Sequence, residues 1–422
     1  MTARTLWREL AKTRRGIASV CTAHPIAIEA AMLESQAAGR PLLIEATCNQ
    51  VNQMGGYTGM TPAAFRRFVE GIAAHIGFDT GRLILGGDHL GPNPWRHLAP
   101  EEAMQNAEAM VSAYAQAGFA KFHLDTSMGC AGESRALPDE VTASRAARLA
   151  RVAETVVAEP PVYVIGTEVP VPGGALETVG DLTPTHPDAA RTTVAVHRDA
   201  FAAAGLDSAF ARAVAVVVQP GVEFGNTEVV AYQRGRAQAL SAALADLAPL
   251  VFEAHSTDYQ SADALAALVQ DGFAILKVGP WLTFALREAL YGLDHIAQAL
   301  APAPADASLP AAMERLMLRE PKHWRSYHHG DADSLRVQRH YSYSDRLRYY
   351  WPQSEAQAAV GRLIARLDGR TIPETLISQY LPMLYPAVVA GTVPITAHAL
   401  QIAAVGGVLQ RYNAACGLGP AL

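Results

Sequence analysis

The sequence has few cysteines, no excess of basic charge and no long apolar run. Its 422 residues include four cysteines, which lie far apart and form no CxxC pair. This spacing indicates reduced thiols rather than a disulfide framework or a zinc knuckle. The net charge of −6 argues against nucleic-acid binding, which needs a concentrated basic face. We therefore expect a cytoplasmic protein that binds no nucleic acid.

Signals for export, membrane insertion and several common cofactors are missing as well. The opening segment MTARTLWRELAKTRRG is polar and basic, without the apolar core of a signal peptide. No apolar run approaches the roughly 20 residues of a membrane span. The sequence contains no GxxxxGK[ST] loop and no dinucleotide-binding fingerprint. HSTDYQ lacks the glycines of a nucleophile elbow, so ATP, NAD and serine-nucleophile chemistry are not expected.

The sequence alternates between two textures from residue 16 to about 290. Short apolar runs end in Gly, Pro or polar residues, and Ala-rich stretches of helical period follow them. The predicted strands are Gly16–Cys21, Pro41–Ala46, Leu83–Gly86, Lys121–Leu124, Val162–Ile165, Val214–Val218, Leu250–Ala254 and Ala274–Val278. Eight strands alternating with helices predict a parallel (β/α)8 barrel over residues 1–300, with an open doubly wound sheet as the alternative.

The texture changes after residue 300. APAPADASLP has the composition of a linker, and residues 354–367, 373–391 and 396–412 follow with helical patterns. We predict that residues 301–422 form a mainly helical extension that packs on the barrel or serves as a surface for homo-oligomer assembly.

Charged and polar residues stand at the predicted carboxyl ends of the strands, which meet at one mouth in a barrel. In LILGGDHLGP, for example, Asp88 and His89 directly follow a buried run. One such residue is usually a helix cap or a structural hydrogen-bond partner, but six of the eight predicted strands share the pattern. In strand order, the candidate residues are Glu45, Asn49, Gln50, Asp88, His89, His123, Asp125, Glu168, Gln219, Glu223, His255, Ser256, Thr257, Asp258, Lys277 and Gly279. Among them, the candidates for substrate binding are Glu45, Asn49, Gln50, His123, Gln219, Ser256, Thr257, Asp258, Lys277 and Gly279.

A cluster of carboxylates at one mouth is unfavourable unless protons or a cation neutralise it. A single divalent ion would do so. His89 and His255, with Glu168 or Glu223, suit Zn²⁺ or Mn²⁺ and leave a coordination position open for a substrate. Asp88, beside a metal ligand and apolar walls, is then the candidate acid or base.

The segment RHYSYSDRLRYYW interleaves Arg339, Arg346 and Arg348 with aromatic residues. Because Arg suits phosphate, Arg339 and Arg346 are candidates for a sugar-phosphate contact. A stacked Arg–Tyr interface between extension and barrel, or between subunits, explains the segment equally well. Ser256, Thr257 and Lys277–Gly279 are slightly better phosphate candidates, because many barrels bind phosphate after strands seven and eight.

Several of these segments closely resemble the GatZ/KbaZ family, named as accessory subunits of class II D-tagatose-1,6-bisphosphate aldolase. They are GIASVCTAHP, LLIEATCNQVNQMGGYTGMTP, LGGDHLGPNPW, KFHLDTSMGCAGE, YVIGTEVPVPGG, QPGVEFG, FEAHSTDYQ and RHYSYSDRLRYYW. The resemblance covers nearly the whole chain and implies a barrel related to the zinc-dependent class II aldolases. It implies an acid/base role for Asp88 and metal-ligand roles for His89 and His255. Class II catalytic chains have a further histidine near strand six, which Glu223 or Gln219 would have to replace here.

Some members of this family look like enzymes of tagatose or galactitol catabolism that interconvert D-tagatose 6-phosphate and D-fructose 6-phosphate. In such a 4-epimerisation a metal holds the C2 carbonyl and C3 hydroxyl while a base takes the C4 hydroxyl proton. The C3–C4 bond breaks and re-forms with C4 inverted. Asp88, with Glu168 or Asp125, would transfer the protons. The kinase name sometimes given to the family has no support in the residues.

Two other functions are compatible with the resemblance. The chain could be a non-catalytic partner of a separate aldolase catalytic subunit, or an aldolase by itself. The crowded mouth favours catalysis, because a scaffold has no physical need to bring carboxylates and imidazoles together.

Overall fold

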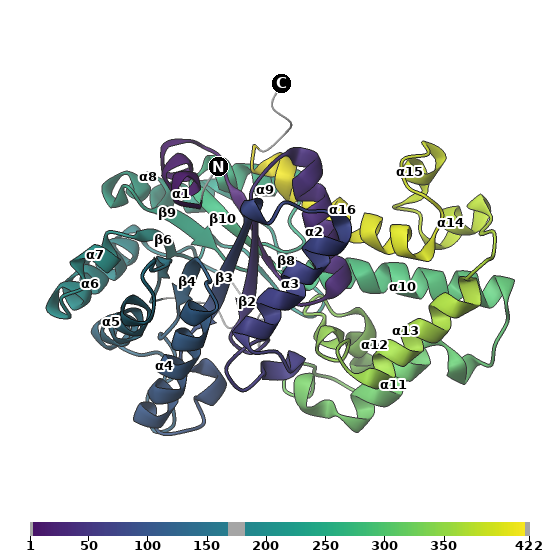
Figure 1. Cartoon of the computed structure of the whole chain (residues 1–422), viewed down its shortest axis with the longest axis horizontal. Coiled ribbons are helices and arrows are strands. Elements are labelled where there is room, and N and C mark those ends of the chain that lie inside the picture. Colours follow the sequence, from purple (N-terminus) through teal and green to yellow (C-terminus); the bar gives the residue numbers. More distant parts are fainter. Residues whose placement is uncertain (1–2, 168–181, 418–422) are drawn as a thin grey trace.

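A computed structural model describes residues 3–167 and 182–417. At its centre eight parallel strands form a closed barrel, in which β10 pairs with β1 (Figure 1). The barrel strands are β1 (Ile17–Cys21), β2 (Leu42–Thr47), β3 (Leu83–Leu90), β4 (Lys121–Leu124), β5 (Val162–Ile165), β6 (Ala213–Val217), β9 (Val251–Ala254) and β10 (Phe273–Val278). All eight predicted strands are present, and closure confirms the barrel over the open sheet.

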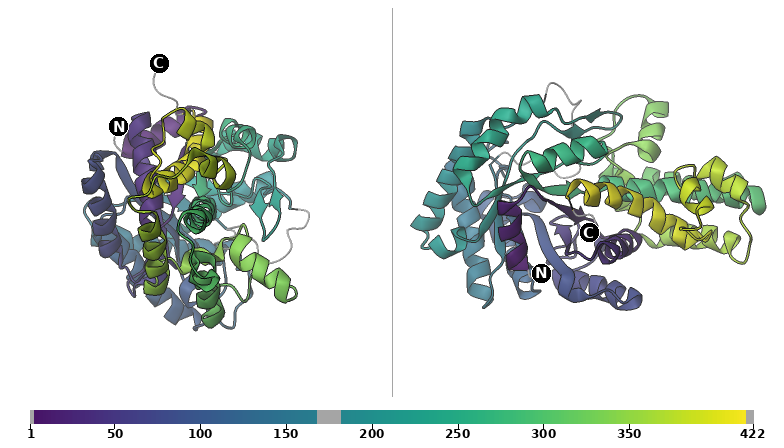
Figure 2. Two further views of the ribbon diagram at one scale, coloured as in Figure 1. Left: turned by 90° about the vertical axis from the view of Figure 1, so that its right-hand side faces the viewer. Right: turned by 90° about the horizontal axis from the view of Figure 1, so that it is seen from above.

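Helices surround the barrel in the order expected of the fold (Figure 2). They are α2 (Pro25–Ala38), α3 (Pro62–Ile76), α4 (Pro100–Gln116), α5 (Asp139–Val156), α6 (Pro187–Ala203), the short α7 (Asp207–Phe210), α8 (Arg234–Ala243), α9 (Ala262–Gln270) and α10 (Pro280–Leu300). Local sequence sets their starts: the Thr61 side chain accepts a hydrogen bond from the backbone N–H of Ala64, with Pro62 in the first turn. A small antiparallel pair, β7 (Glu223–Phe224) and β8 (Val229–Val230), follows β6.

The amino-terminal end of the barrel is filled by apolar side chains. Helix α1 (Ala3–Lys12) packs against this end, and its buried residues there are Leu6, Trp7 and Leu10. They contact inward-facing strand residues such as Leu43 and Ile275. Since alternate strand residues point to the same side, the next inward positions toward the mouth are Glu45 and Lys277. The interior therefore changes from apolar to charged within two residues.

Strand β3 is four residues longer than predicted, because its two glycines do not form a turn. A Cβ on Gly86 would lie 2.8 Å from Oε1 of Glu45, and one on Gly87 would lie 2.6 Å from Leu90. The glycines thus continue the strand and leave room for neighbouring side chains. Asp88 and His89 consequently stand on the last residues of β3 rather than in a loop after it.

The remaining helices extend the molecule to one side of the barrel, on the right in Figure 1. They are α11 (Leu309–Arg319), α12 (Ala332–Tyr341), α13 (Ser354–Leu367), α14 (Glu374–Tyr380), α15 (Tyr385–Val389) and α16 (Ala397–Ala415). Helix α16 packs on α2, α9 and α10, whereas α11 and α13 pack together and against α10. Because α10 belongs to the barrel and also contacts the extension, the division at residue 300 stays a prediction.

The single helical stretch predicted over residues 373–391 is wrong, because the structure has two helices there. Helix α14 ends at Tyr380, and Leu381 takes a non-helical conformation before Pro382. A residue that precedes proline is sterically disfavoured in the helical region, which explains the break.

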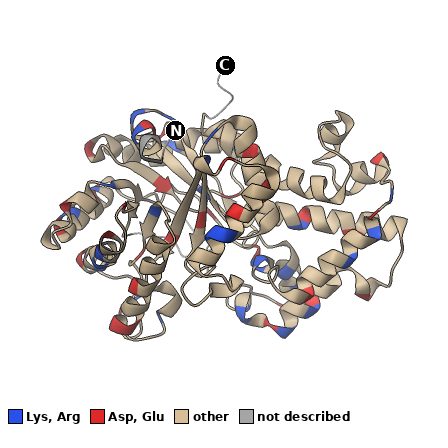
Figure 3. Cartoon of the chain, viewed as in Figure 1, with Lys and Arg blue, Asp and Glu red and all other residues tan. Residues whose placement is uncertain are grey.

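Charges of both signs are scattered over the outer helices, and some central strands also carry charged residues (Figure 3). No helix among residues 3–167 and 182–417 is long and apolar enough to cross a membrane.

Candidate functional site

The carboxyl ends of the strands surround a small cavity of about 70 Å³, here called the mouth. Nine predicted site residues line it: Asn49, Gln50, Asp88, His89, His255, Ser256, Asp258, Lys277 and Gly279. Further lining side chains that were not predicted include those of Cys21, Thr47, Tyr57, Arg348 and Tyr349.

Three imidazoles meet beneath the mouth. The ring centroids of His89 and His255 lie 4.9 Å apart, and that of His123 lies 5.0 Å from each. The sequence predicted that His89 and His255 would meet, but it gave His123 only a substrate-binding role. His123 lies in β4 and Asp125 follows directly after the strand with the same parity, and this alternation was the signal for a third imidazole.

Two of the three rings are held by buried carboxylates. Nδ1 of His89 lies 2.7 Å from Oδ2 of Asp125, and Nε2 of His255 lies 3.0 Å from Oε1 of Glu253. Burial lowers the pKa of His255 to about 3, so its ring is neutral. A neutral ring that donates Nε2–H to Glu253 keeps a free lone pair on Nδ1. Burial opposes the charged form of His89, but Asp88 and Asp125 outweigh it and raise its pKa.

The third ring carries an unsatisfied atom. Nδ1–H of His123 donates to Oδ1 of Asp88 at 3.1 Å, which leaves a lone pair on the buried Nε2, an atom with no hydrogen-bond partner among the described residues. Ligand atoms from Asp88, His123, Glu253 and His255 all lie within 4.8 Å of one another. Imidazoles oriented by carboxylates are the usual surroundings of a bound metal, so these residues fit a divalent ion.

Below the imidazoles, two lysines and two glutamates form a buried charged layer. Nζ of Lys121 lies 2.5 Å from Oε1 of Glu45 and 2.7 Å from Oε2 of Glu253. Lys277 also forms an ion pair with Glu45. Burial opposes the charge of Lys121, but Glu253 and Glu45 outweigh it and raise its pKa. Glu45 and Lys277 were predicted to bind substrate, but they form an ion pair with each other. That Lys121 and Glu253 belong to the same charged layer was not predicted.

Asp88 joins the charged layer to the imidazoles. Its Oδ1 lies 2.5 Å from Nζ of Lys277 and 3.1 Å from Nδ1 of His123, and its Oδ2 accepts from Thr47 Oγ1 at 3.0 Å. Burial opposes ionisation of Asp88, but His89 and Lys277 hold its pKa well below the usual range. Asp88 is therefore a carboxylate that lines the mouth in a fixed orientation.

The backbone is in the left-handed region at two mouth positions. His89 has φ of +50° and Ser256 has φ of +53°. Non-glycine residues adopt this region rarely, and they do so most often at sites where neighbouring structure holds the side chain in place. At His89 the ring bond to Asp125 provides such a constraint.

Several residues predicted for the site instead form hydrogen bonds with the backbone of their own loop. Oε1 of Gln219 accepts from the backbone N–H groups of Gly221 and Val222, and Oε1 of Glu223 accepts from that of Phe224. Of the residues predicted as metal ligands, His255 belongs to the metal-compatible group, whereas His89 and Glu223 belong to no such group among the described residues. Burial raises the pKa of Glu223 to about 7. His123, rather than Gln219 or Glu223, supplies the third imidazole, and Glu168 lies outside the described residues.

The phosphate candidates after β9 and β10 are bound within the chain. The hydroxyl of Thr257 donates to the carbonyl of Lys277 at 2.6 Å. Oδ1 of Asp258 accepts from the N–H groups of Gly279 and Trp281, at the start of α10. Burial raises the pKa of Asp258 to about 6. The backbone N–H groups at the start of α10 are thus already bonded to the carboxyl group of Asp258 rather than left free for a phosphate.

The Arg–Tyr segment mainly joins the extension to itself and to the barrel. Arg339 forms two hydrogen bonds with Glu314, and Arg346 lies over the rings of Tyr327 and Tyr349. Neither arginine lines the mouth. Arg348, which was not among the candidates, is the arginine of this segment that lines it, in the 3-10 turn η7 (Arg346–Tyr349). Arg346 thus packs against aromatic rings, whereas Arg348, two residues later, faces the mouth.

Comparison with known proteins agrees with this architecture. The model of the family described as D-tagatose-1,6-bisphosphate aldolase subunit GatZ/KbaZ-like matches residues 4–417. The chain belongs to the GatZ/KbaZ-like family. A family relative from Agrobacterium fabrum (strain C58), a D-tagatose 6-phosphate 4-epimerase, is 56% identical over 408 residues, which are 96% of this chain and 95% of that protein. The crystal structure of a probable tagatose 6 phosphate kinase from Sinorhizobium meliloti 1021 is 60% identical, with a TM-score of 0.90, and covers 95% of this chain and 100% of that chain.

Proposed function

We propose that this chain is a metal-dependent sugar-phosphate 4-epimerase that interconverts D-tagatose 6-phosphate and D-fructose 6-phosphate. The observation that carries the proposal is the 56% identity, over 96% of the chain, to a protein of that activity. The mouth supports it, because it combines an ionised carboxylate with three imidazoles in one buried cluster.

His123 and His255, whose ligand atoms lie within 4.8 Å of those of Asp88 and Glu253, are the residues that would hold a divalent ion, Zn²⁺ or Mn²⁺. The predicted ligand role of His89 stays a prediction. The ion would act as a Lewis acid that polarises a substrate carbonyl. Glu253 orients His255 and Asp125 orients His89, through the ring hydrogen bonds described above. We therefore assign Asp125 a positioning role, while the predicted role of Glu168 stays a prediction.

Asp88 is the base in this proposal. As an ionised group on the wall of the mouth, it accepts the proton of the C4 hydroxyl while the C3–C4 bond breaks. The electron pair of that bond moves through C2 to the C2 oxygen, which leaves an enediolate, and C4 becomes the aldehyde carbon. The aldehyde carbon then turns its other face, the bond re-forms, and Asp88 returns the proton to the C4 oxygen. Thr47 and Lys277 keep the carboxylate in place through both steps.

Purified chain incubated with D-tagatose 6-phosphate and Mn²⁺ or Zn²⁺ tests the proposal. We expect D-fructose 6-phosphate without release of triose, and loss of activity on chelation with recovery when metal is restored. Asp88→Asn should lower kcat by about 10²- to 10⁴-fold, the usual contribution of a general base, while the circular dichroism spectrum is unchanged. Activity of a folded Asp88→Asn variant equal to wild type would remove Asp88 from the mechanism.

The family description favours a second function, as an accessory subunit of a D-tagatose-1,6-bisphosphate aldolase. In that case the chain alone converts neither D-tagatose 6-phosphate nor D-tagatose 1,6-bisphosphate. Adding it to the aldolase catalytic subunit then raises the release of triose phosphates from the bisphosphate. The kinase function named for the Sinorhizobium meliloti protein gains no support here, since no phosphate-binding GxxxxGK[ST] loop is present.

We also propose that the enzyme works in the cytoplasm. The support is that Cys21, Cys48, Cys130 and Cys416 are all free thiols, as expected in a reducing compartment. A homo-oligomer built through the extension stays a prediction.

A further inference from the structure

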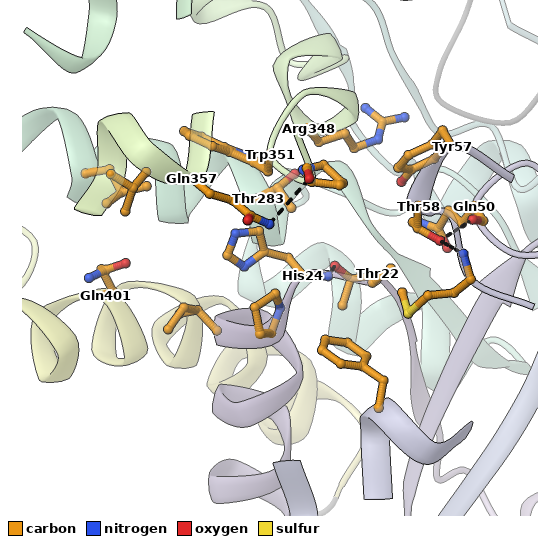
Figure 4. Close-up of a pocket in the computed structure, with 18 of the residues that line it drawn as sticks. Thr22, His24, Gln50, Tyr57, Thr58, Thr283, Arg348, Trp351, Gln357 and Gln401 are labelled. Carbon is orange, nitrogen blue, oxygen red and sulfur yellow. Dashed lines mark hydrogen bonds between the residues drawn. The ribbon is translucent and has the colours of Figure 1, made fainter. Parts of the chain in front are cut away.

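A second and larger cavity, here called the side cavity, adjoins the mouth. It has a volume of about 600 Å³ and lies between α2, α10, α13 and α16. The mouth and the side cavity share the wall residues Cys21, Gln50, Tyr57, Gly279 and Arg348. In Figure 4, Tyr57, Thr58, Gln50 and Arg348 lie on one side of the side cavity and Gln401 lies on the opposite side.

The mouth alone is too small for a phosphorylated hexose. Its volume of about 70 Å³ compares with roughly 300–1,000 Å³ for ordinary ligand sites. The side cavity falls within that range and begins where the mouth ends. Its wall is mainly apolar, but it also presents the polar side chains of Thr22, Thr58 and Gln357, and Gln50, Tyr57 and Arg348 stand on the wall that it shares with the mouth.

A phosphate group also needs a cation that is not already neutralised. Lys277 pairs with Glu45 and Asp88. Arg348 differs, because no carboxylate of the described residues forms an ion pair with it. It donates to the carbonyls of Ser344 and Asp345 and to the hydroxyl of Tyr349. Within the described part of the chain these bonds use three of its five N–H donors, which leaves two for a ligand.

We propose that the mouth and the side cavity form one substrate site, in which Arg348 binds the phosphate group of the sugar phosphate. The inference rests on the proposed function, and it adds the residue that distinguishes a phosphorylated sugar from a free one. The reacting carbons lie at the imidazoles, and the phosphate end extends to the shared wall. The half-buried guanidinium provides charge-assisted hydrogen bonds to the phosphate oxygens.

The decisive experiment compares Arg348→Met with wild type for D-tagatose 6-phosphate and D-tagatose. Binding is measured by isothermal titration in an Asp88→Asn background, which prevents turnover, and KM and kcat are measured without that change. We expect Arg348→Met to weaken sugar-phosphate binding about 10- to 100-fold, the usual effect of losing charge-assisted hydrogen bonds. Affinity for D-tagatose should not change, and KM should rise more than kcat falls.

Matched variants separate phosphate binding from folding. Arg348→Lys keeps the charge and should recover part of the affinity. Arg234→Met removes an exposed arginine that pairs with Asp271 on the barrel surface and should leave KM at the wild-type value. Melting temperatures show whether Arg348→Met also loosens η7. Wild-type affinity in Arg348→Met, or equal weakening for both sugars, would overturn the inference.

A second substitution tests the side cavity without touching Arg348. Gly361 lines this cavity from α13, and no heavy atom lies within 4 Å of the position that its Cβ would take. Gly361→Phe should therefore fold and raise KM, whereas Gly71→Phe, at an equally open position of α3, should not. Unchanged KM in Gly361→Phe would exclude the side cavity from the substrate site.

The same measurements distinguish this inference from the proposed function. Arg348-dependent binding of the sugar phosphate without formation of D-fructose 6-phosphate would overturn the epimerase and leave the phosphate site. Epimerisation with a KM that does not depend on Arg348 would overturn the phosphate site and leave the epimerase function standing.

Discussion

The two ends of the barrel interior are built from opposite chemistry, although the same eight strands pass through both. At the amino-terminal end, Leu43, Ile275 and their neighbours form an apolar cluster with α1. Two residues further along these strands, Glu45 and Lys277 are fully or nearly fully buried and paired with each other. The change occurs because every second strand residue points inward, so one strand can contribute to both layers.

The comparison separates stability from function. Each apolar side chain buried at the amino-terminal end contributes about 1.5–3 kcal/mol to folding. A buried ion pair gives little net stability, because removing charges from water offsets most of their attraction. The charged layer is therefore the less stabilising half of the core. Its charges are explained by the side chains of the site that they hold in position. Three variants, from the largest expected effect to the smallest, test this division.

Lys121→Met should have the largest effect on stability. The change leaves Glu45 and Glu253 to share the single charge of Lys277, so one buried carboxylate loses its compensation, which costs about 3–5 kcal/mol. We expect a loss of that size in the free energy of unfolding, measured by urea denaturation. The matched control is Lys322→Met at an exposed position, which should stay within about 0.5 kcal/mol of wild type. A loss below about 1 kcal/mol for Lys121→Met would mean that the glutamates do not depend on this lysine.

Gly86→Ala should have an intermediate effect. Gly86 pairs with Glu45 on one side and with Lys121 on the other, so its missing side chain lets these two meet across β3. An added Cβ would stand 2.8 Å from Glu45, which Lys121 and Lys277 hold in place. Overpacking of this kind costs about 1–3 kcal/mol.

The control for Gly86→Ala is the same change at Gly71, which has open space in α3. Gly71→Ala should raise stability by about 0.5–1 kcal/mol, because alanine favours a helix interior. Urea denaturation of both variants checks the pair. If Gly86→Ala were as stable as wild type, the side chain of Glu45 would be able to move away, and its ion pairs with Lys121 and Lys277 would not fix its position.

Local pattern explains how much of this fold could be predicted from the sequence. The barrel strands are short apolar runs, and their helices have clear starts, so neighbours in the sequence decide both. The predicted strand at residues 83–86 was too short because glycine marks a turn more often than a packing gap, and only Glu45, 41 positions away, reveals the gap. The break after Tyr380 could have been predicted from Pro382, since proline acts locally.

The candidate site was predictable where strand ends supply it. Asp88, His89 and His255 follow from strand ends and from the resemblance, and the structure brings them together. Arg348 could not be separated from its neighbour Arg346 by sequence, because only the docking of the extension decides which arginine faces the mouth. The buried lysines and glutamates have one local signal, a charge inside an otherwise apolar strand, but their partners lie on other strands.

Ile275→Val should have the smallest effect and should show the two halves to be independent. Ile275 is fully buried in the apolar layer, on the same strand as Lys277 and two residues before it. Losing one methylene there costs about 0.5–1.5 kcal/mol, which urea denaturation resolves. Because the valine side chain keeps the strand geometry and adds no polar group, kcat and KM for the sugar phosphate should equal those of wild type. A fall in kcat without a matching loss of stability would show that the apolar layer positions Lys277 and Asp88 directly, and the separation of stability from function would then fail at the strand they share.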